Sequence, residues 1–203
     1  MKIVEMARAP NPRRVRIFLA EKGVSVPFEQ VDLNAGQHKS SEFTRLNPFQ
    51  RVPVLVLDDG TCISESVAIC RYFEELQPKP PLMGRDPLDK ANVEMWQRRM
   101  EINLLQHVAH TFRHLHPAMS EMEVPQVPAW GEANRPRALA TLRMLDEELG
   151  RRQYVAGDTY SIADITALVA VDFMKPAKIE RPPELKNLAR WHGEVSSRPS
   201  AAA

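Results

Sequence analysis

Residues 47–75 read NPFQRVPVLVLDDGTCISESVAICRYFEE, and this stretch decides the fold of the first third of the chain. Val52 to Leu57 is an apolar run rich in β-branched residues, which is typical of a strand. The Asp-Asp-Gly at 58–60 is a strong turn signal, so residues 61–63 can return as a second strand. From Val67 onward the apolar residues recur at helical spacing. The stretch therefore predicts strand, turn, strand and helix.

The same residues predict a ligand. Pro53 stands at the start of a strand, where a missing N–H is tolerated, and a bond before proline adopts cis at a cost of only about 0.5–1 kcal/mol. A cis Val52–Pro53 bond would turn the N–H and C=O of Val52 outward, free to pair with an extended peptide. The next helix would offer its N-terminus and the Ser66 hydroxyl to a carboxylate, and Glu65 suits an ammonium. We expect a ligand with a zwitterionic end and a short peptide backbone.

Glutathione is such a ligand, and here the sequence resembles the soluble glutathione transferase family, whose N-terminal domains carry a Val-Pro followed by Glu-Ser or Gln-Ser. The resemblance is to theta-, beta- and nu-like bacterial members and covers nearly the whole chain. It implies an α/β thioredoxin-like domain followed by an all-α helical domain. The apolar pattern agrees, because strands expected at 2–6 and 28–33, each followed by a helix, complete a β-α-β-α-β-β-α order with parallel first strands.

The prolines at 78, 80 and 81 break the third helix and mark the domain boundary. We expect a glutathione-binding domain at 1–77, a linker at 78–88 and a helical domain with the co-substrate pocket at 89–203. Within the helical domain we predict a long helix, a loop, three further helices and a frayed tail. The long helix is expected at 89–116, the loop at 117–130 and the tail at 199–203.

Composition excludes several classes of protein. Lysine and arginine number 27 against 26 aspartates and glutamates, so the net charge is close to zero, whereas a nucleic-acid-binding face is usually basic. No apolar run approaches the roughly 20 residues of a membrane span, and Met1-Lys2 leads into an apparent strand without a signal peptide's apolar core. The two cysteines, Cys62 and Cys70, suit inert thiols in a reducing compartment. We expect a cytoplasmic protein with no nucleic-acid or membrane partner.

The thiol-activating position departs from the family pattern. Family members place the glutathione sulfur at the loop before the first helix, where related sequences read Ser-Pro-Asn or Thr-Pro-Asn. This chain reads Ala9-Pro10-Asn11, so the hydroxyl is lost. Asn11 is then the best remaining side-chain donor, helped by backbone N–H groups of the first helix and by Arg13; the alternative is that Asn11 only shapes the turn. We take Asn11 as the candidate catalytic residue.

The resemblance also implies the residues that hold glutathione. In theta-like members a histidine before the second helix and a basic residue before Val-Pro contact the glycine carboxylate, and His38 and Arg51 match them, with Lys39 beside His38. Charge-assisted donors of this kind suit a carboxylate. The predicted glutathione-binding residues are His38, Lys39, Arg51, Val52, Pro53, Glu65 and Ser66.

Two other patterns favour structural roles. His107, His110 and His114 share a helix face and could be zinc ligands, but the nearby carboxylates that usually support zinc histidines are scarce, so we expect a solvated or cleft-lining face and no metal. Residues 161–164 read Ser-Ile-Ala-Asp, a capping box like the one buried in the family's helical domain, and we assign Asp164 to folding.

The prediction from sequence is a dimeric glutathione transferase with a role in detoxification, whose bound thiolate attacks an electrophilic small molecule. One alternative is a glutathione-dependent disulfide or peroxide reductase, which suits a site lacking both the hydroxyl and a catalytic cysteine. The other is a non-catalytic glutathione-binding or scaffold protein, which Ala9 favours and the intact Val-Pro and Glu-Ser pairs oppose.

Overall fold

A computed structural model describes all 203 residues. The chain divides into two compact units, one formed by Met1–Leu82 together with Pro199–Ala203 and the other by Met83–Arg198. None of the helices combines the length and the apolar character that a membrane crossing requires.

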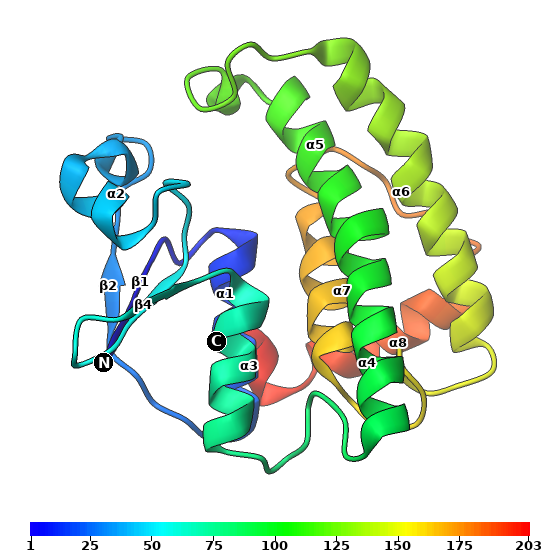
Figure 1. Cartoon of the computed structure of the whole chain (residues 1–203). Coiled ribbons are helices and arrows are strands. Elements are labelled where there is room, and N and C mark those ends of the chain that lie inside the picture. Colours follow the sequence, from blue (N-terminus) through cyan, green and yellow to red (C-terminus); the bar gives the residue numbers. More distant parts are fainter. The chain divides into compact units, whose positions relative to one another are not determined.

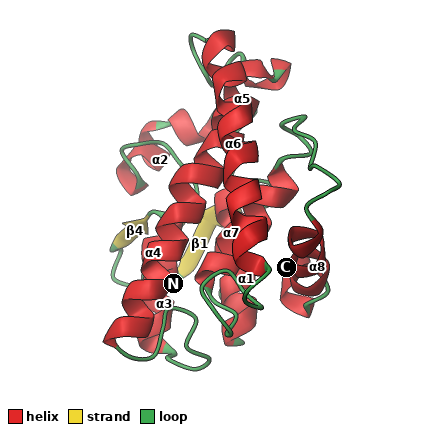
Figure 2. Cartoon of the chain, turned by 90° about the vertical axis from the view of Figure 1, so that its right-hand side faces the viewer, coloured by secondary structure: helices red, strands yellow, loops and turns green.

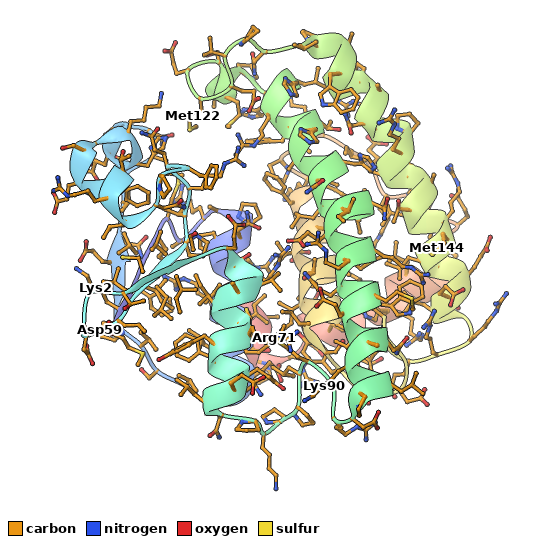
Figure 3. The ribbon with its side chains drawn as sticks, in the orientation of Figure 1. Lys2, Asp59, Arg71, Lys90, Met122 and Met144 are labelled. Atoms are coloured by element: carbon orange, nitrogen blue, oxygen red, sulfur yellow. The ribbon has the colours of Figure 1, made fainter.

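The first unit has the predicted β-α-β-α-β-β-α order. Its elements are β1 (Lys2–Glu5), α1 (Pro10–Lys22), β2 (Phe28–Gln30), the short 3₁₀ turn η1 (Gln37–Lys39), α2 (Ser41–Leu46), β3 (Val54–Val56), β4 (Cys62–Ser64) and α3 (Ser66–Leu76). The sheet order is β2-β1-β3-β4, with β1 and β2 parallel and the β3–β4 hairpin antiparallel, as predicted. The turn between β3 and β4 brings Asp59 to the same end of the sheet as Lys2 (Figure 3).

Both faces of this sheet are covered. Val4 and Val54 are paired neighbours on β1 and β3, and they pack with Phe43 of α2 in one core cluster. Side chains alternate between the faces of a strand, so the fully buried Ile3 and Leu55 face the other way. The helices α1 and α3 pack against each other, whereas α2 lies apart from them (Figure 1). A site at the ends of β3 and α3 therefore stands on a rigid core.

The second unit is all helical. It contains α4 (Pro87–Met100), the π-helical segment η2 (Glu101–Leu105), α5 (Gln106–Leu115), the 3₁₀ turn η3 (Pro117–Met119), α6 (Pro128–Leu149), α7 (Ile162–Phe173) and α8 (Lys186–Ser196). The first three run on as one column, close to the long helix predicted at 89–116, and α6 and α7 lie beside it (Figures 1 and 2).

The helix α7 is the centre of this unit, with every residue from Ser161 to Val171 buried. The predicted capping box is present: Ser161 caps the helix, and the Asp164 carboxylate accepts from the Ser161 N–H at 3.0 Å. Asp164 also accepts from the Val155 N–H at 2.8 Å and from the indole N–H of Trp191 at 2.9 Å. One buried carboxylate thus joins α7 to α8 and to the turn before α7.

Two segments differ from the sequence-based expectation. The helix α6 begins at Pro128, inside the stretch expected to be a loop until residue 130, because proline suits the first helical turn. Residues 199–203 are not frayed and group with the first unit. There Ser200 is buried and bonds to the Glu21 carboxylate, and Arg13 donates to the Ala201 carbonyl at 3.2 Å.

Candidate functional site

A cavity of about 270 Å³ opens in the first unit where α1, the 47–53 loop and α3 meet. Six of the eight predicted site residues line it, together with two that sequence reasoning missed, Asn47 and Phe49. The six are Asn11, Arg51, Val52, Pro53, Glu65 and Ser66.

Asn47 holds the loop that forms one wall. It is only 1 % exposed, its side-chain amide donates to the Arg51 carbonyl at 2.8 Å, and its side-chain oxygen accepts from the Phe49 N–H at 3.0 Å. Gln50 completes the turn with a φ of 55°. Asn47 thereby fixes where Arg51 and Val52 lie, and the Asn-Pro pair at 47–48 was the sequence signal that could have found it.

The Val52–Pro53 peptide bond is cis. The N–H and C=O of Val52 make no hydrogen bond within the chain. A backbone donor and acceptor on the wall of a cavity need partners from outside the protein. An extended peptide is one ligand that can satisfy both groups together.

Glu65 and Ser66 form the opposite wall at the start of α3. Glu65 has a φ of 69°, in a region that costs a residue with a side chain about 1–3 kcal/mol and occurs most often at functional sites. Its side chain does not cap α3, and no acidic residue lies in the first turn. The first N–H groups of α3 are therefore open to an anion, which the helix dipole also favours.

The hydroxyl of Ser66 has a partner below the cavity. Its oxygen accepts from the Nη1 of Arg14 at 2.9 Å, and Arg14 is fully buried in the middle of α1. Sequence reasoning missed this residue, because three arginines at 13, 14 and 16 look alike in a helical pattern and only packing separates them.

The start of α1 offers fewer donors than we expected. Pro10 and Pro12 have no N–H, and the N–H of Arg13 bonds to the Ala9 carbonyl at 3.2 Å. Only the N–H of Asn11 remains open in this turn, next to the exposed Asn11 side chain. The Arg13 guanidinium bonds to Ala201 and does not line the cavity. Any thiol-directed interaction from α1 therefore falls to Asn11 alone.

His38 and Lys39 lie in η1 and do not line the cavity. Burial, followed by the charge of Lys39, lowers the pKa of His38 below its usual value. The contact of His38 with the glycine carboxylate stays a prediction. The buried Nδ1 of His38 has no partner within the chain.

The cysteines and the histidine face show burial and contacts within the chain. Cys70 is buried, and this burial raises the pKa of its thiol to about 12, whereas Cys62 is only half-buried. Both cysteines are free. His107 bonds through Nδ1 to Asn134 at 2.7 Å, and the Nδ1 of His114 accepts from the Val127 N–H at 3.1 Å. No group of three potential ligands could hold a metal ion.

Comparison with known proteins shows the family of the chain. The family model described as the glutathione S-transferase N-terminal domain matches residues 1–75, and the C-terminal domain model matches residues 109–199. Glutathione S-transferase 2 of Saccharomyces cerevisiae is 40 % identical over 203 residues, covering 98 % of this chain and 87 % of the yeast protein. The chain belongs to the glutathione S-transferase family.

Solved structures of family members have the same fold. A glutathione S-transferase domain-containing protein of Marinobacter aquaeolei is 39 % identical with a TM-score of 0.96, covering 98 % of this chain and 99 % of that one. Gtt2 of Saccharomyces cerevisiae is 40 % identical with a TM-score of 0.95, covering 100 % and 99 %. The predicted family, the fold class and the assignment to the transferases are confirmed for this glutathione S-transferase family member.

Proposed function

We propose that this glutathione S-transferase family member binds glutathione in the cavity beside Val52 and directs its thiolate at an electrophilic small molecule. The observation that carries the proposal is the meeting of three unsatisfied features on one cavity: the backbone groups of Val52, the open N-terminus of α3 and the charge of Arg51. A short peptide with carboxylates at both ends satisfies all three.

Each part of glutathione has a matching group. The cysteinyl backbone pairs with the N–H and C=O of Val52. The carboxylate of the γ-glutamyl end takes the first N–H groups of α3 and the Ser66 hydroxyl, and Glu65 takes the adjacent ammonium. Arg51 takes the glycine carboxylate, since an arginine binds carboxylates through paired donors. His38 and Lys39 stay predictions for that end.

The chemistry follows from the sulfur. A free thiol is mostly protonated at pH 7, and only the thiolate is the nucleophile; lowering its pKa by two units takes about 2.7 kcal/mol of preferential interaction with the anion. Asn11 supplies that interaction through its amide and its backbone N–H. The thiolate then donates its electron pair to an electrophilic carbon, a C–S bond forms, and the leaving group departs with the pair of the broken bond.

Two finer parts of the proposal concern the whole protein. We propose a homodimer, and the exposure of Met95 (41 %) and Ile102 (40 %), seven residues apart on the column of α4 and η2, supports it. We also propose a reducing compartment such as the cytoplasm, which two free cysteines support. The electrophile and a role in detoxification stay predictions.

The test is calorimetric titration with glutathione in two buffers of different ionisation enthalpy. We expect saturable binding with release of about one proton near neutral pH. Binding without proton release favours a binding protein or a chemistry that needs no activated thiol, and conjugation and disulfide-reduction assays then separate those alternatives. No binding at millimolar glutathione would remove the proposed function.

A pair of double variants tests whether glutathione binds in this cavity. Replacing both Glu65 and Ser66 by alanine should weaken glutathione binding by roughly tenfold or more, because charge-assisted contacts are lost. Ser41→Ala with Glu42→Ala is the matched control, since this exposed Ser-Glu pair also starts a helix but lies outside the cavity. Equal affinity in the two double variants means that the site lies elsewhere.

A further inference from the structure

We infer that Arg14 is a positioning residue for glutathione, orienting the Ser66 hydroxyl toward the ligand's γ-glutamyl carboxylate from below the cavity. The inference rests on the proposed function and deepens it. Arg14 is fully buried and its Nη1 lies 2.9 Å from the Ser66 oxygen, while Ser66 itself lines the cavity.

The hydrogen bond between Arg14 and Ser66 determines where the Ser66 hydroxyl proton can point. A guanidinium can only donate, so the Ser66 oxygen must accept, and one of its lone pairs is used. The hydroxyl proton is then free to point away from Arg14, because the hydrogen bond of the Ser66 hydroxyl within the chain is the one it accepts from Arg14. A carboxylate in the cavity is the acceptor that completes the hydroxyl's hydrogen bonding. Without Arg14 the hydroxyl could rotate and present a lone pair to the ligand, which repels an anion.

The positive charge of Arg14 lies close to the start of α3. Ser66 is the first residue of α3, whose opening N–H groups already favour an anion. Arg14 places a full positive charge directly behind that helix start, in a region from which water is excluded. Charges interact more strongly where the surrounding dielectric is low. The guanidinium therefore favours the carboxylate without touching it.

A purely structural role for Arg14 is the alternative, because the bond also ties α1 to α3. The neighbouring Arg16 separates the two roles. Arg16 lies on the same helix and forms a two-pronged bond to the buried Glu5 carboxylate of β1, away from the cavity. Arg14→Met and Arg16→Met therefore make the same chemical change on one helix, but only the first removes a group that contacts a cavity residue.

The experiment measures glutathione dissociation constants by calorimetry for wild type, Arg14→Met, Ser66→Ala, the double variant and Arg16→Met. We expect Arg14→Met and Ser66→Ala each to weaken binding by about tenfold. The double variant should be little weaker than either, since both remove the same oriented donor. Arg16→Met should lower the melting temperature and leave the affinity unchanged. Multiplying effects in the double variant, or equal losses in Arg14→Met and Arg16→Met, would overturn the inference.

An analogue of glutathione that lacks the γ-glutamyl α-carboxylate gives a second readout. Arg14→Met should weaken the binding of glutathione and leave the affinity for the analogue unchanged. If Arg14 has only a structural role, the variant should bind both ligands more weakly. If Arg14→Met does not fold, Arg14→Lys replaces it in the experiment, because lysine keeps the positive charge but lacks the planar, paired donors of arginine. Arg14→Lys should weaken glutathione binding by about threefold and leave the binding of the analogue unchanged. Equal weakening of both ligands overturns the inference alone. Failure of wild type to bind glutathione overturns it together with the proposed function.

Discussion

Asn11 carries the hydrogen-bond donors that remain for a thiolate at the start of α1. The prolines on either side remove two of the N–H groups that a helix start usually offers, and the next N–H is used by Ala9. Two donors are left, the Asn11 amide and its own backbone N–H, and replacing the side chain removes one of them.

Asn11→Ala should raise the pKa of bound glutathione by about one unit, which corresponds to about 1.4 kcal/mol of lost preference for the thiolate. The measure is the pH dependence of proton release on binding, or of the thiolate's ultraviolet absorbance. Glutathione affinity at low pH, where the thiol is protonated in both proteins, should not change. An unchanged pKa would assign Asn11 to the turn alone.

Asp164 gives the protein a pH-dependent stability. Burial raises the pKa of this carboxyl to about 6, although hydrogen bonds from Val155, Trp191 and Ser161 oppose the change. Its pKa in the unfolded chain is near 3.8, so the folded state holds the proton more tightly. The contribution is complete below about pH 4 and is lost as the pH rises through 6.

Asp164→Asn removes this titration. The free energy of unfolding of wild type, relative to that of Asp164→Asn, should therefore fall by about 2 kcal/mol from pH 4 to pH 7. Urea unfolding at a series of pH values measures it. A difference that grows with pH would mean that the donors around Asp164 outweigh its burial.

At the scale of elements, α5 and α6 approach so closely that one position admits only glycine. A Cβ on Gly131 of α6 would lie 2.6 Å from the Cγ of Leu115 on α5. The hydroxyl of Thr111 also bonds to the Gly131 carbonyl, at 3.3 Å. In contrast, Gly193 lies in α8 with nothing within 4 Å of an added Cβ.

Gly131→Ala and Gly193→Ala should therefore have opposite effects. The first should destabilise the helical unit by roughly 1–3 kcal/mol through overpacking. The second should stabilise it by about 0.5–1 kcal/mol, because alanine loses less conformational freedom in a helix. Thermal unfolding followed by circular dichroism compares them. Equal melting temperatures would show that the close approach of α5 and α6 relaxes at little cost.

At the scale of the whole molecule, the proposed homodimer is the feature to test. Apolar side chains that gather on one exposed face favour a partner surface, and Met95 and Ile102 lie seven residues apart, and so on one face, of the column of α4 and η2. Sedimentation should give about twice the 23.1 kDa of one chain. Ile102→Glu should shift the sedimentation toward the monomer. Val124→Glu, which changes a 79 % exposed valine outside the column of α4 and η2, is the control. A monomeric wild type contradicts the proposal.

Several features of the molecule could be predicted from sequence because they depend on local patterns. The Asp-Asp-Gly turn sets the hairpin, the spacing of apolar residues sets the helices, and Ser161 with Asp164 sets the start of α7. That Val52, Glu65 and Ser66 line one cavity could be predicted for the same reason, since they lie at the ends of elements that the sequence defines.

Tertiary structure alone decided the rest. Arg14 looks like Arg13 and Arg16 in the sequence, and only the packing of α1 against α3 buries it beneath Ser66. His38 follows the family pattern, yet the fold places it in η1 and not among the residues that line the cavity. A sequence specifies which groups a segment carries, whereas burial, charge and contact depend on residues distant in the chain that folding brings together.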